Sequence, residues 1–340
     1  MALVIVSSPR FADHVTPAGH PERVARAAVF DEVARRWSGR GARVVEPAPA
    51  GHDDLRRVHD ARYLEALAGA AGRSVTLDPD TVTSPHSHHV ALLAAGAACL
   101  AADLAVAGNH PTAAFVRPPG HHAERDRAMG FCLFNNVAVA AARARQSGVA
   151  RVAIVDIDVH HGNGTQWAYY EDPAVLYVSL HQYPYYPGTG GVAEIGRGAG
   201  SGTTVNIPLE AGATDADYDL ALASVVVPVL EAFGPELVIV SAGYDAHHRD
   251  PLAGMRVSTE GFGAVMARLW SLAVETCAGR LVVVTEGGYD LPALGDGLEV
   301  TLETIATAPR PVTPVQGDTS RAREALAALR AVQAPYWPTL

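Results

Sequence analysis

The sequence predicts one α/β domain over residues 1–340, with an open parallel sheet of eight strands and helices on both faces. Short runs rich in Val, Ile and Leu recur along the whole chain, and helical patterns separate most of them. Most of these runs are continuously apolar instead of alternating, which is typical of strands that are covered on both faces. Strands that alternate with helices in this way favour a parallel, doubly wound sheet.

Each predicted strand is short, and the run with the weakest pattern is Arg43–Val45. The other strands are predicted at Leu3–Ser7, Ala113–Val116, Arg151–Asp156, Val175–Leu180, Thr204–Ile207, Leu237–Ser241 and Leu281–Thr285. The first helix, Pro21–Trp37, begins with a proline, which suits the first turn of a helix. Further helices are predicted at Val90–Val106, Asn136–Gln146, Asp215–Phe233, Thr259–Thr276, Leu291–Ala306 and, with a charged pattern, Thr319–Val332.

The composition is that of a folded domain and excludes several kinds of partner. Hydrophobic residues make up 49% of the chain and charged residues 18%, a balance that builds a core. The net charge of −10 and the lack of basic clusters argue against a nucleic-acid partner. Cys99, Cys132 and Cys277 match no disulfide or zinc-finger spacing, so we expect free thiols. We see no signal peptide and no run of roughly 20 apolar residues, and therefore expect a cytoplasmic protein without a membrane partner.

Polar residues gather directly after several predicted strands. In an open parallel sheet the ligand binds beyond the carboxyl ends of the strands, so these residues should share one rim. The segments concerned are Arg117–His122, Asp156–Gly164, Ser179–His181, Ser241–Asp245 and Glu286–Tyr289. They deliver His, Asp and Tyr side chains to the same edge of the predicted sheet.

The segment that follows Arg151–Asp156 has the spacing of a metal site. Residues two apart in an extended segment point the same way, so Asp156, Asp158 and His160 could share a face. Asp245, after another strand, could complete the set. Three protein ligands with one open position are the pattern of a catalytic zinc site. The same donors also suit iron(II) or cobalt(II), so the identity of the metal stays open.

Two further motifs at this rim offer acid–base and oxyanion chemistry. The tandem His121-His122 follows a rigid Pro-Pro-Gly turn, and imidazole titrates near neutrality, which makes both rings candidates for proton transfer. Each ring needs a partner on its other nitrogen, and Asp156 and Asn163 can supply it. Tyr289, after Gly287-Gly288, can donate a hydrogen bond to a carbonyl oxygen that becomes an oxyanion.

In combination these motifs resemble the arginase–deacetylase superfamily, and within it the class II histone deacetylases and their bacterial amidohydrolase relatives. The resemblance spans about residue 14 to residue 306. The motifs that carry it are His20–Arg23, Arg117–His122, Gly130–Asn136, Asp156–Gly164, Tyr186–Gly190, Ser241–Asp245 and Glu286–Tyr289. It implies the fold of that superfamily and a metal-dependent hydrolysis of an acyl amide.

The resemblance also implies a role for each matching residue. It places one zinc ion on Asp158, His160 and Asp245. His122, backed by Asn163, matches the general base and acid of the family. His121, backed by Asp156, matches a histidine that mainly supplies electrostatic stabilisation, and Tyr289 matches the residue that polarises the scissile carbonyl.

A substrate channel and a potassium site are implied in the same way. The matching channel residues are Gly130, Phe131, Tyr186, Leu252, Gly287 and Gly288. Tyr186 stands where phenylalanine is commoner, which alters the polarity of the channel wall. The potassium (K+) positions match Asp156, Asp158, His160, Ser179 and Leu180. Many relatives are dimers or tetramers, which leaves a homodimer or a homotetramer open.

The expected substrate is an acylated amine, with acyl-lysine first. Polyamine-selective relatives carry an acidic residue seven positions after the last zinc-ligand aspartate, where this chain has Leu252. That difference favours acyl-lysine or a neutral small amide, and an acetylpolyamine or another small acetylated amine is the alternative. A third hypothesis is a catalytically idle module that only binds acyl groups. The presence of all three candidate catalytic side chains, His121, His122 and Tyr289, argues against it.

Overall fold

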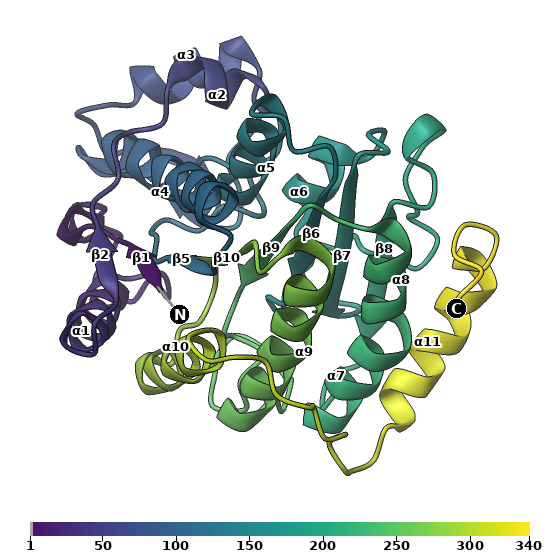
Figure 1. The fold of residues 1–340 in the computed structure, drawn as a ribbon. Helices are drawn as coiled ribbons and strands as arrows, with labels where there is room; N and C mark the ends of the chain where they lie inside the picture. The colour runs from purple at the N-terminus through teal and green to yellow at the C-terminus, as the bar shows by residue number, and fades with distance from the viewer. Residues whose placement is uncertain (1–2) are drawn as a thin grey trace.

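All eight strands of the predicted sheet are present in the computed structural model, which describes residues 3–340 (Figure 1). They are β1 (Val4–Val6), β2 (Arg43–Val45), β5 (Thr112–Ala114), β6 (Val152–Asp156), β7 (Val175–Gln182), β8 (Thr204–Leu209), β9 (Leu237–Ala242) and β10 (Leu281–Thr285). Their order in the sheet is β2-β1-β5-β10-β9-β6-β7-β8, and every neighbouring pair is parallel. The predicted fold class is therefore confirmed, and the first two residues of the predicted domain lie outside the described part.

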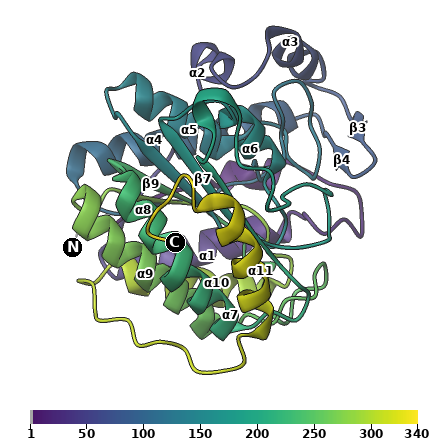
Figure 2. The ribbon, with the colours of Figure 1, turned by 90° about the vertical axis from the view of Figure 1, so that its right-hand side faces the viewer.

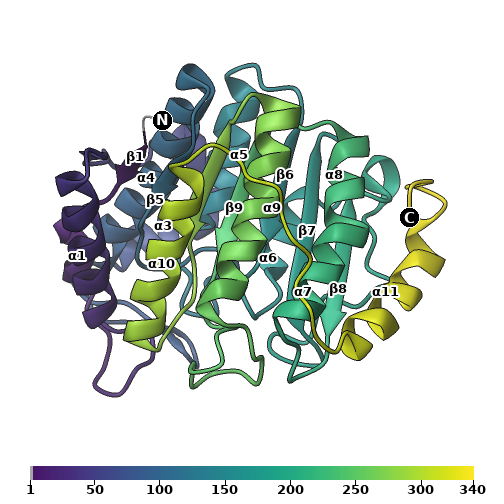
Figure 3. The ribbon, with the colours of Figure 1, turned by 60° about the horizontal axis from the view of Figure 1, so that its bottom comes forward.

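The helices form a layer on each face of the sheet (Figures 2 and 3). One layer holds α2 (His52–Arg56), α3 (Ala61–Gly69), α4 (Ser87–Gly108), α5 (Asn136–Gln146) and α6 (Asn163–Tyr169). The other holds α1 (Ala25–Gly39), α7 (Asp215–Ala221), α8 (Val227–Phe233), α9 (Thr259–Cys277) and α10 (Leu291–Ile305). The last helix, α11 (Ser320–Gln333), packs beside the edge strand β8, so the two chain ends lie toward opposite edges of the sheet (Figure 3).

The continuously apolar strands are explained by these two layers. Successive residues of a strand point to opposite faces. In β6, Val152 and Ile154 join the core under α4 and α5, whereas Ala153 and Val155 join the core under α9. Both faces are buried, so Val152–Val155 are all apolar, and only the last residue of the strand, Asp156 at the rim, is charged.

Helix α4 corrects one expectation about membrane-spanning segments. An 18-residue window within it has a mean hydropathy of 2.1, so by length and composition the helix could cross a bilayer. However, 67% of that window is buried inside the protein. The helix contacts α5 on one side and strands β1, β5 and β10 on the other, which explains why it is apolar on most of its circumference. The expectation of no such run is therefore wrong, but the run belongs to the core.

The helices α2, α3 and α6 were not predicted, and other local features differ from the prediction as well. Helix α1 begins at Ala25 instead of Pro21, because the Glu22 carbonyl is used by Thr16 Oγ1 and His20 Nδ1. The predicted helix over 215–233 contains a π-helical turn at Leu222–Val226, just before Pro228, whose missing N–H cannot continue the α-helical ladder. An antiparallel hairpin of β3 (Thr76–Asp78) and β4 (Thr81–Val82) was not predicted.

Candidate active site

The carboxyl ends of the central strands are level with one another. Asp156 at the end of β6 is paired with Ser179 on β7 and with Ser241 on β9. Ser241 is paired in turn with Val284 on β10. The polar segments that follow these strands therefore leave the sheet at the same height, which places their side chains on one rim as the sequence predicts.

Asp158, His160 and Asp245 form a buried cluster at this rim. Their ligand atoms all lie within 4.8 Å of one another, and no other cluster of three such residues was found among residues 3–340. His160 Nδ1 lies 3.1 Å from Asp158 Oδ1 and 3.2 Å from Asp245 Oδ2. Asp156 is not a member, because its carboxylate faces His121 and Tyr177 instead. The structure thus groups the three residues that the resemblance assigns to zinc.

The surroundings of this cluster fit a metal ion. Asp245 Oδ2 is buried and has no hydrogen-bond partner, although such atoms are rarely left unpaired. The other oxygens are held by main-chain donors: Gly287 N donates to Asp158 Oδ2, and Val159 N donates to Asp245 Oδ1. A Cβ at Gly287 would lie 2.1 Å from Asp245 Oδ2, so only glycine leaves the space between the two carboxylates free.

The two buried carboxylates of the cluster also favour the binding of a cation. Burial and the negative charge of Asp158 raise the pKa of the Asp245 carboxyl to about 7. Burial lowers the pKa of His160, but its hydrogen bond to Asp158 and the nearby negative charge of Asp245 outweigh this and raise the pKa to about 9. The doubly protonated ring of His160 thus supplies the positive charge between the carboxylates. A divalent cation bound to all three residues would remove the repulsion between the two buried acids.

The tandem histidines have opposite electrostatic environments although their ring centroids are only 4.0 Å apart. Burial lowers the pKa of His121, but Asp158 and Asp156 more than offset this and raise it to about 10. Burial lowers the pKa of His122 well below its ordinary value, and positively charged His121 and His160 lower it further. His121 is therefore poised to be an imidazolium and His122 to be a neutral proton acceptor, a division of labour typical of acid–base sites.

Each histidine has the predicted partner. His121 Nδ1 lies 3.1 Å from Asp156 Oδ2, and His122 Nδ1 lies 2.8 Å from Asn163 Oδ1. One contact was not predicted: the Glu286 carboxylate accepts the main-chain N–H groups of Gly120 and His121. Glu286 therefore connects the loop that carries His121 and His122 to the end of β10. No local sequence pattern predicts this role.

A cavity of about 170 Å³ opens above the cluster. Its lining residues are Asp80, His122, Gly130, Phe131, His160, Tyr185, Tyr186, Leu252 and Tyr289. Four of the six predicted channel residues line this cavity. Gly287 and Gly288 do not, and lie against the two carboxylates and Tyr244. Tyr186 packs edge-on against His122 at 5.1 Å, and the unpredicted Tyr185 stacks on His160 at 5.5 Å.

Asp80 reaches this cavity from the β3–β4 hairpin. Its Oδ1 accepts the main-chain N–H of Gly130 and the hydroxyl of Thr81. Thr81 Oγ1 accepts the N–H of Phe131, so the hairpin fixes the Gly130-Phe131 wall of the channel. No local sequence pattern predicts this role, because Asp80 lies 50 positions away from the wall that it supports.

Tyr289 is held at the wall of the cavity by three contacts. Its main-chain N–H donates to Asp250 Oδ2 at 2.7 Å, and its ring packs edge-on against Phe131. The guanidinium of Arg26 lies 5.2 Å from the ring centroid, and its Nε donates to the Gly288 carbonyl at 2.8 Å. Burial raises the pKa of the Tyr289 phenol well above its ordinary value. The hydroxyl therefore keeps its proton and can act as a hydrogen-bond donor.

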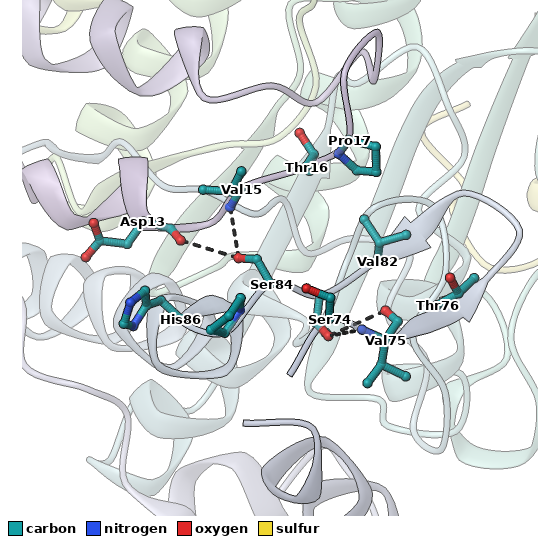
Figure 4. A pocket seen from close by; sticks show the side chains of 12 residues that line it. Asp13, Val15, Thr16, Pro17, Ser74, Val75, Thr76, Val82, Ser84 and His86 are labelled. Atoms are coloured by element: carbon teal, nitrogen blue, oxygen red, sulfur yellow. Dashed lines mark hydrogen bonds between the residues drawn. The ribbon is translucent and has the colours of Figure 1, made fainter. Parts of the chain in front are cut away.

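Two other features of the structure are a hollow with few ionisable groups and the predicted potassium site. A larger hollow of about 550 Å³ lies between the segment 13–17 and the β3–β4 hairpin, where Ser84 Oγ accepts the Val15 N–H and bonds to the Asp13 carbonyl (Figure 4). Asp13 and His86 are the only ionisable groups among its lining residues. At the predicted potassium site, Ser179 Oγ bonds to His181 Nδ1 and Asp156 Oδ1 accepts the Asp158 N–H. The potassium prediction remains untested.

Comparisons with known proteins agree with this geometry. The family described as "Histone deacetylase domain" matches residues 20–305. The chain is 40% identical to "Histone deacetylase 10, chloroplastic" of Oryza sativa subsp. japonica over 85% of this chain and 70% of that protein. It is 47% identical to "Histone deacetylase-like amidohydrolase" of Pseudomonas aeruginosa over 71% of this chain and 64% of that protein.

Two further similarities are to a human deacetylase and to a solved structure. The chain is 36% identical to "Polyamine deacetylase HDAC10" of Homo sapiens, over 94% of this chain and 49% of that protein. The crystal structure of the HDA15 HD domain superposes with a TM-score of 0.92 at 34% identity, over 99% of this chain and 96% of that one.

Proposed function

The chain belongs to the histone deacetylase domain family, and we propose that it hydrolyses acyl-lysine amides with one zinc ion held by Asp158, His160 and Asp245. The observation that carries the proposal is the buried cluster of two carboxylates and one imidazole at the floor of a narrow cavity. His122 and Tyr289 line the same cavity, so a proton acceptor and a hydrogen-bond donor face the metal position.

The reaction follows from the state of each side chain. When bound, a zinc ion would polarise the acyl carbonyl and lower the pKa of a water molecule. Neutral His122 takes the proton of the attacking water at Nε2 and then passes it to the amine nitrogen as the C–N bond breaks. Tyr289 donates its phenol O–H to the carbonyl oxygen as that oxygen gains negative charge. The products are a carboxylate and a free amine.

The wall of the cavity supports acyl-lysine as the substrate. Phe131, Tyr186 and Leu252 present carbon surface to a long aliphatic chain such as that of lysine. Leu252 stands at the position where polyamine-selective relatives carry an acid, so a second ammonium group would find no carboxylate there.

Asp80 is the residue of the cavity that favours the alternative, an acetylated polyamine. Only its Oδ1 is engaged by Gly130 and Thr81, and its side chain lines the cavity. A carboxylate there can pair with an ammonium group or accept the N–H of a peptide. The substitution Asp80→Asn, described below, distinguishes binding of an ammonium group from binding of a peptide N–H.

The test compares kcat/KM of the zinc-loaded protein on an acetyl-lysine peptide and on N-acetylated polyamines, with His122→Ala as the inactive control. We expect a preference for the peptide, and Leu252→Glu should shift the preference toward polyamines. Asp80→Asn separates the two uses of Asp80: a loss confined to polyamines means that it binds an ammonium group. A wild-type preference for polyamines would overturn acyl-lysine as the substrate, and zinc binding without any turnover would support the idle binding module instead.

A further inference from the structure

Glu124 connects the surface of the protein to the imidazole of His122 through one buried amide. Glu124 Oε1 accepts hydrogen bonds from Asn163 Nδ2 at 2.7 Å and from Arg127 at 2.8 Å. The other end of the amide, Asn163 Oδ1, lies 2.8 Å from His122 Nδ1. Asn163 is 1% exposed, whereas the side chain of Glu124 is 15% exposed. The three side chains therefore form a chain of hydrogen bonds that leads from solvent to the ring.

This chain fixes where the proton of His122 lies. A carboxylate can only accept hydrogen bonds, so Asn163 must turn its NH₂ group to Glu124 and its oxygen to His122. An amide oxygen can also only accept, so His122 Nδ1 must carry the proton of the neutral ring. The other nitrogen, Nε2, is then left with a free lone pair, which is the state that a proton acceptor needs.

Without Glu124 this orientation would lose its main support. The remaining acceptors near Asn163 Nδ2 are the His122 carbonyl at 3.5 Å, which is long for an N–H···O bond, and Met129 Sδ at 3.4 Å, a weak acceptor. The amide could then rotate by half a turn and offer Nδ2 to His122 Nδ1. In that arrangement the proton of the ring moves to Nε2, and the ring can no longer accept a proton from that side.

We propose that Glu124 is a positioning residue for His122, which acts by fixing the orientation of the Asn163 amide and so the tautomer of the ring. The proposal rests on the proposed function, in which His122 Nε2 is the proton acceptor. The main chain at Glu124 has hydrogen bonds that do not involve the side chain. The main-chain N–H of Glu124 donates to the Arg127 carbonyl, and its own carbonyl accepts from His59 Nδ1.

Single substitutions at position 124 separate positioning from charge. Glu124→Ala should lower kcat by about 10- to 100-fold, the usual effect of removing such an outer partner. KM should stay unchanged, because Glu124 does not line the cavity. Glu124→Gln should restore most of the rate, since its amide oxygen can still accept from both Asn163 and Arg127. Asp126→Ala is the matched control: it removes an exposed acid of the same loop that has no contact with Asn163.

A double-mutant cycle tests the route through Asn163. In Asn163→Asp, either carboxylate oxygen can accept from His122 Nδ1, so the tautomer no longer depends on Glu124. Adding Glu124→Ala to Asn163→Asp should then lower kcat no further. An equal loss in both backgrounds would mean that Glu124 acts by another route and would overturn the proposal.

The tautomer itself can be read without turnover. In ¹⁵N NMR of histidine-labelled, zinc-loaded protein, with the His122 signals assigned from His122→Gln, the Nδ1–H and Nε2–H forms give different patterns. We expect Nδ1–H in the wild type and in Glu124→Gln, and a large Nε2–H fraction in Glu124→Ala. A Glu124→Ala protein that keeps His122 fully in the Nδ1–H form contradicts the proposal. A failure of the proposed function would show separately, as an inactive wild type whose tautomer still responds to Glu124→Ala.

Discussion

Gly287→Ala should damage the metal site through a single added methyl group. A Cβ at residue 287 would lie 2.1 Å from Asp245 Oδ2 and 2.6 Å from Asp158 Oδ2, whereas real Cβ contacts essentially never fall below 3.0 Å. The carboxylate oxygens must therefore retreat by about 1 Å, several times the ~0.2 Å tolerance of a zinc site. An error of ~1 Å in a reacting geometry costs about 100-fold in rate. We expect zinc affinity and kcat/KM to fall by about that factor or more.

The assay measures zinc affinity by competition with a chelating dye and kcat/KM on the preferred substrate. Gly295→Ala is the matched control, since its Cβ would meet Val29 Cγ1 at an ordinary 3.6 Å inside α10. It should leave activity unchanged and stabilise the helix by up to ~1 kcal/mol. A Gly287→Ala protein with wild-type zinc affinity and activity would refute the placement of Gly287 between the metal ligands.

Two further predictions concern catalysis and acid stability. Tyr289→Phe should lower kcat by roughly 100- to 1000-fold, the usual cost of losing one oxyanion donor, while the zinc content of the protein stays the same. Retention of most of the activity would exclude the phenol as that donor. Burial lowers the pKa of His59 to about 4 and outweighs the hydrogen bond from its Nδ1 to the Glu124 carbonyl, which raises the pKa. Its Nε2 accepts the Asn135 N–H, so the neutral ring has both nitrogens paired. In the unfolded chain the pKa of this histidine is near 6.5, so the unfolded chain binds the proton first as the pH falls. The contribution of neutral His59 to the free energy of unfolding is therefore fully present above pH 6.5 and is lost toward pH 4, by roughly 3 kcal/mol. Chemical unfolding at several pH values should show a smaller loss in His59→Gln, and exposed His52→Gln should behave like the wild type; an unchanged loss in His59→Gln would assign the acid sensitivity to other groups.

The large features of the fold could be predicted because they depend on simple patterns. A strand covered on both faces is apolar along most of its length, as Val152–Val155 are, and all eight predicted runs, including the weak run Arg43–Val45, became strands. The site could be located because parallel strands end at one edge, which brings Asp158 and Asp245 together from segments far apart in the sequence.

The parts that were not predicted depend on contacts between distant segments. The β3–β4 hairpin has strands of three and two residues, too short for any periodicity to be seen. Asp80, which that hairpin delivers to the cavity, therefore looked like an ordinary loop residue. Glu124 and Glu286 act through main-chain and amide partners elsewhere in the fold, so their roles depend on tertiary geometry and not on a local motif.

For helix α4 the local pattern can be seen in the sequence, but the same apolar pattern is compatible with a membrane span and with a buried core helix. Its mean hydropathy is high enough for a membrane span. Only its packing against the sheet and beside α5 shows that it belongs to a protein core. The π-helical turn before Pro228 could have been anticipated from the proline alone, since no α-helical N–H is available there.

The central claim, a single catalytic zinc site at Asp158, His160 and Asp245, is tested most directly by titrating the metal-free protein with zinc. Deacylase activity should be absent without metal, rise in proportion to added zinc and level off at one equivalent per chain, while His122→Ala binds the same amount of zinc and stays inactive. Full activity of the chelator-treated protein, or a requirement for two equivalents per chain, would contradict the account.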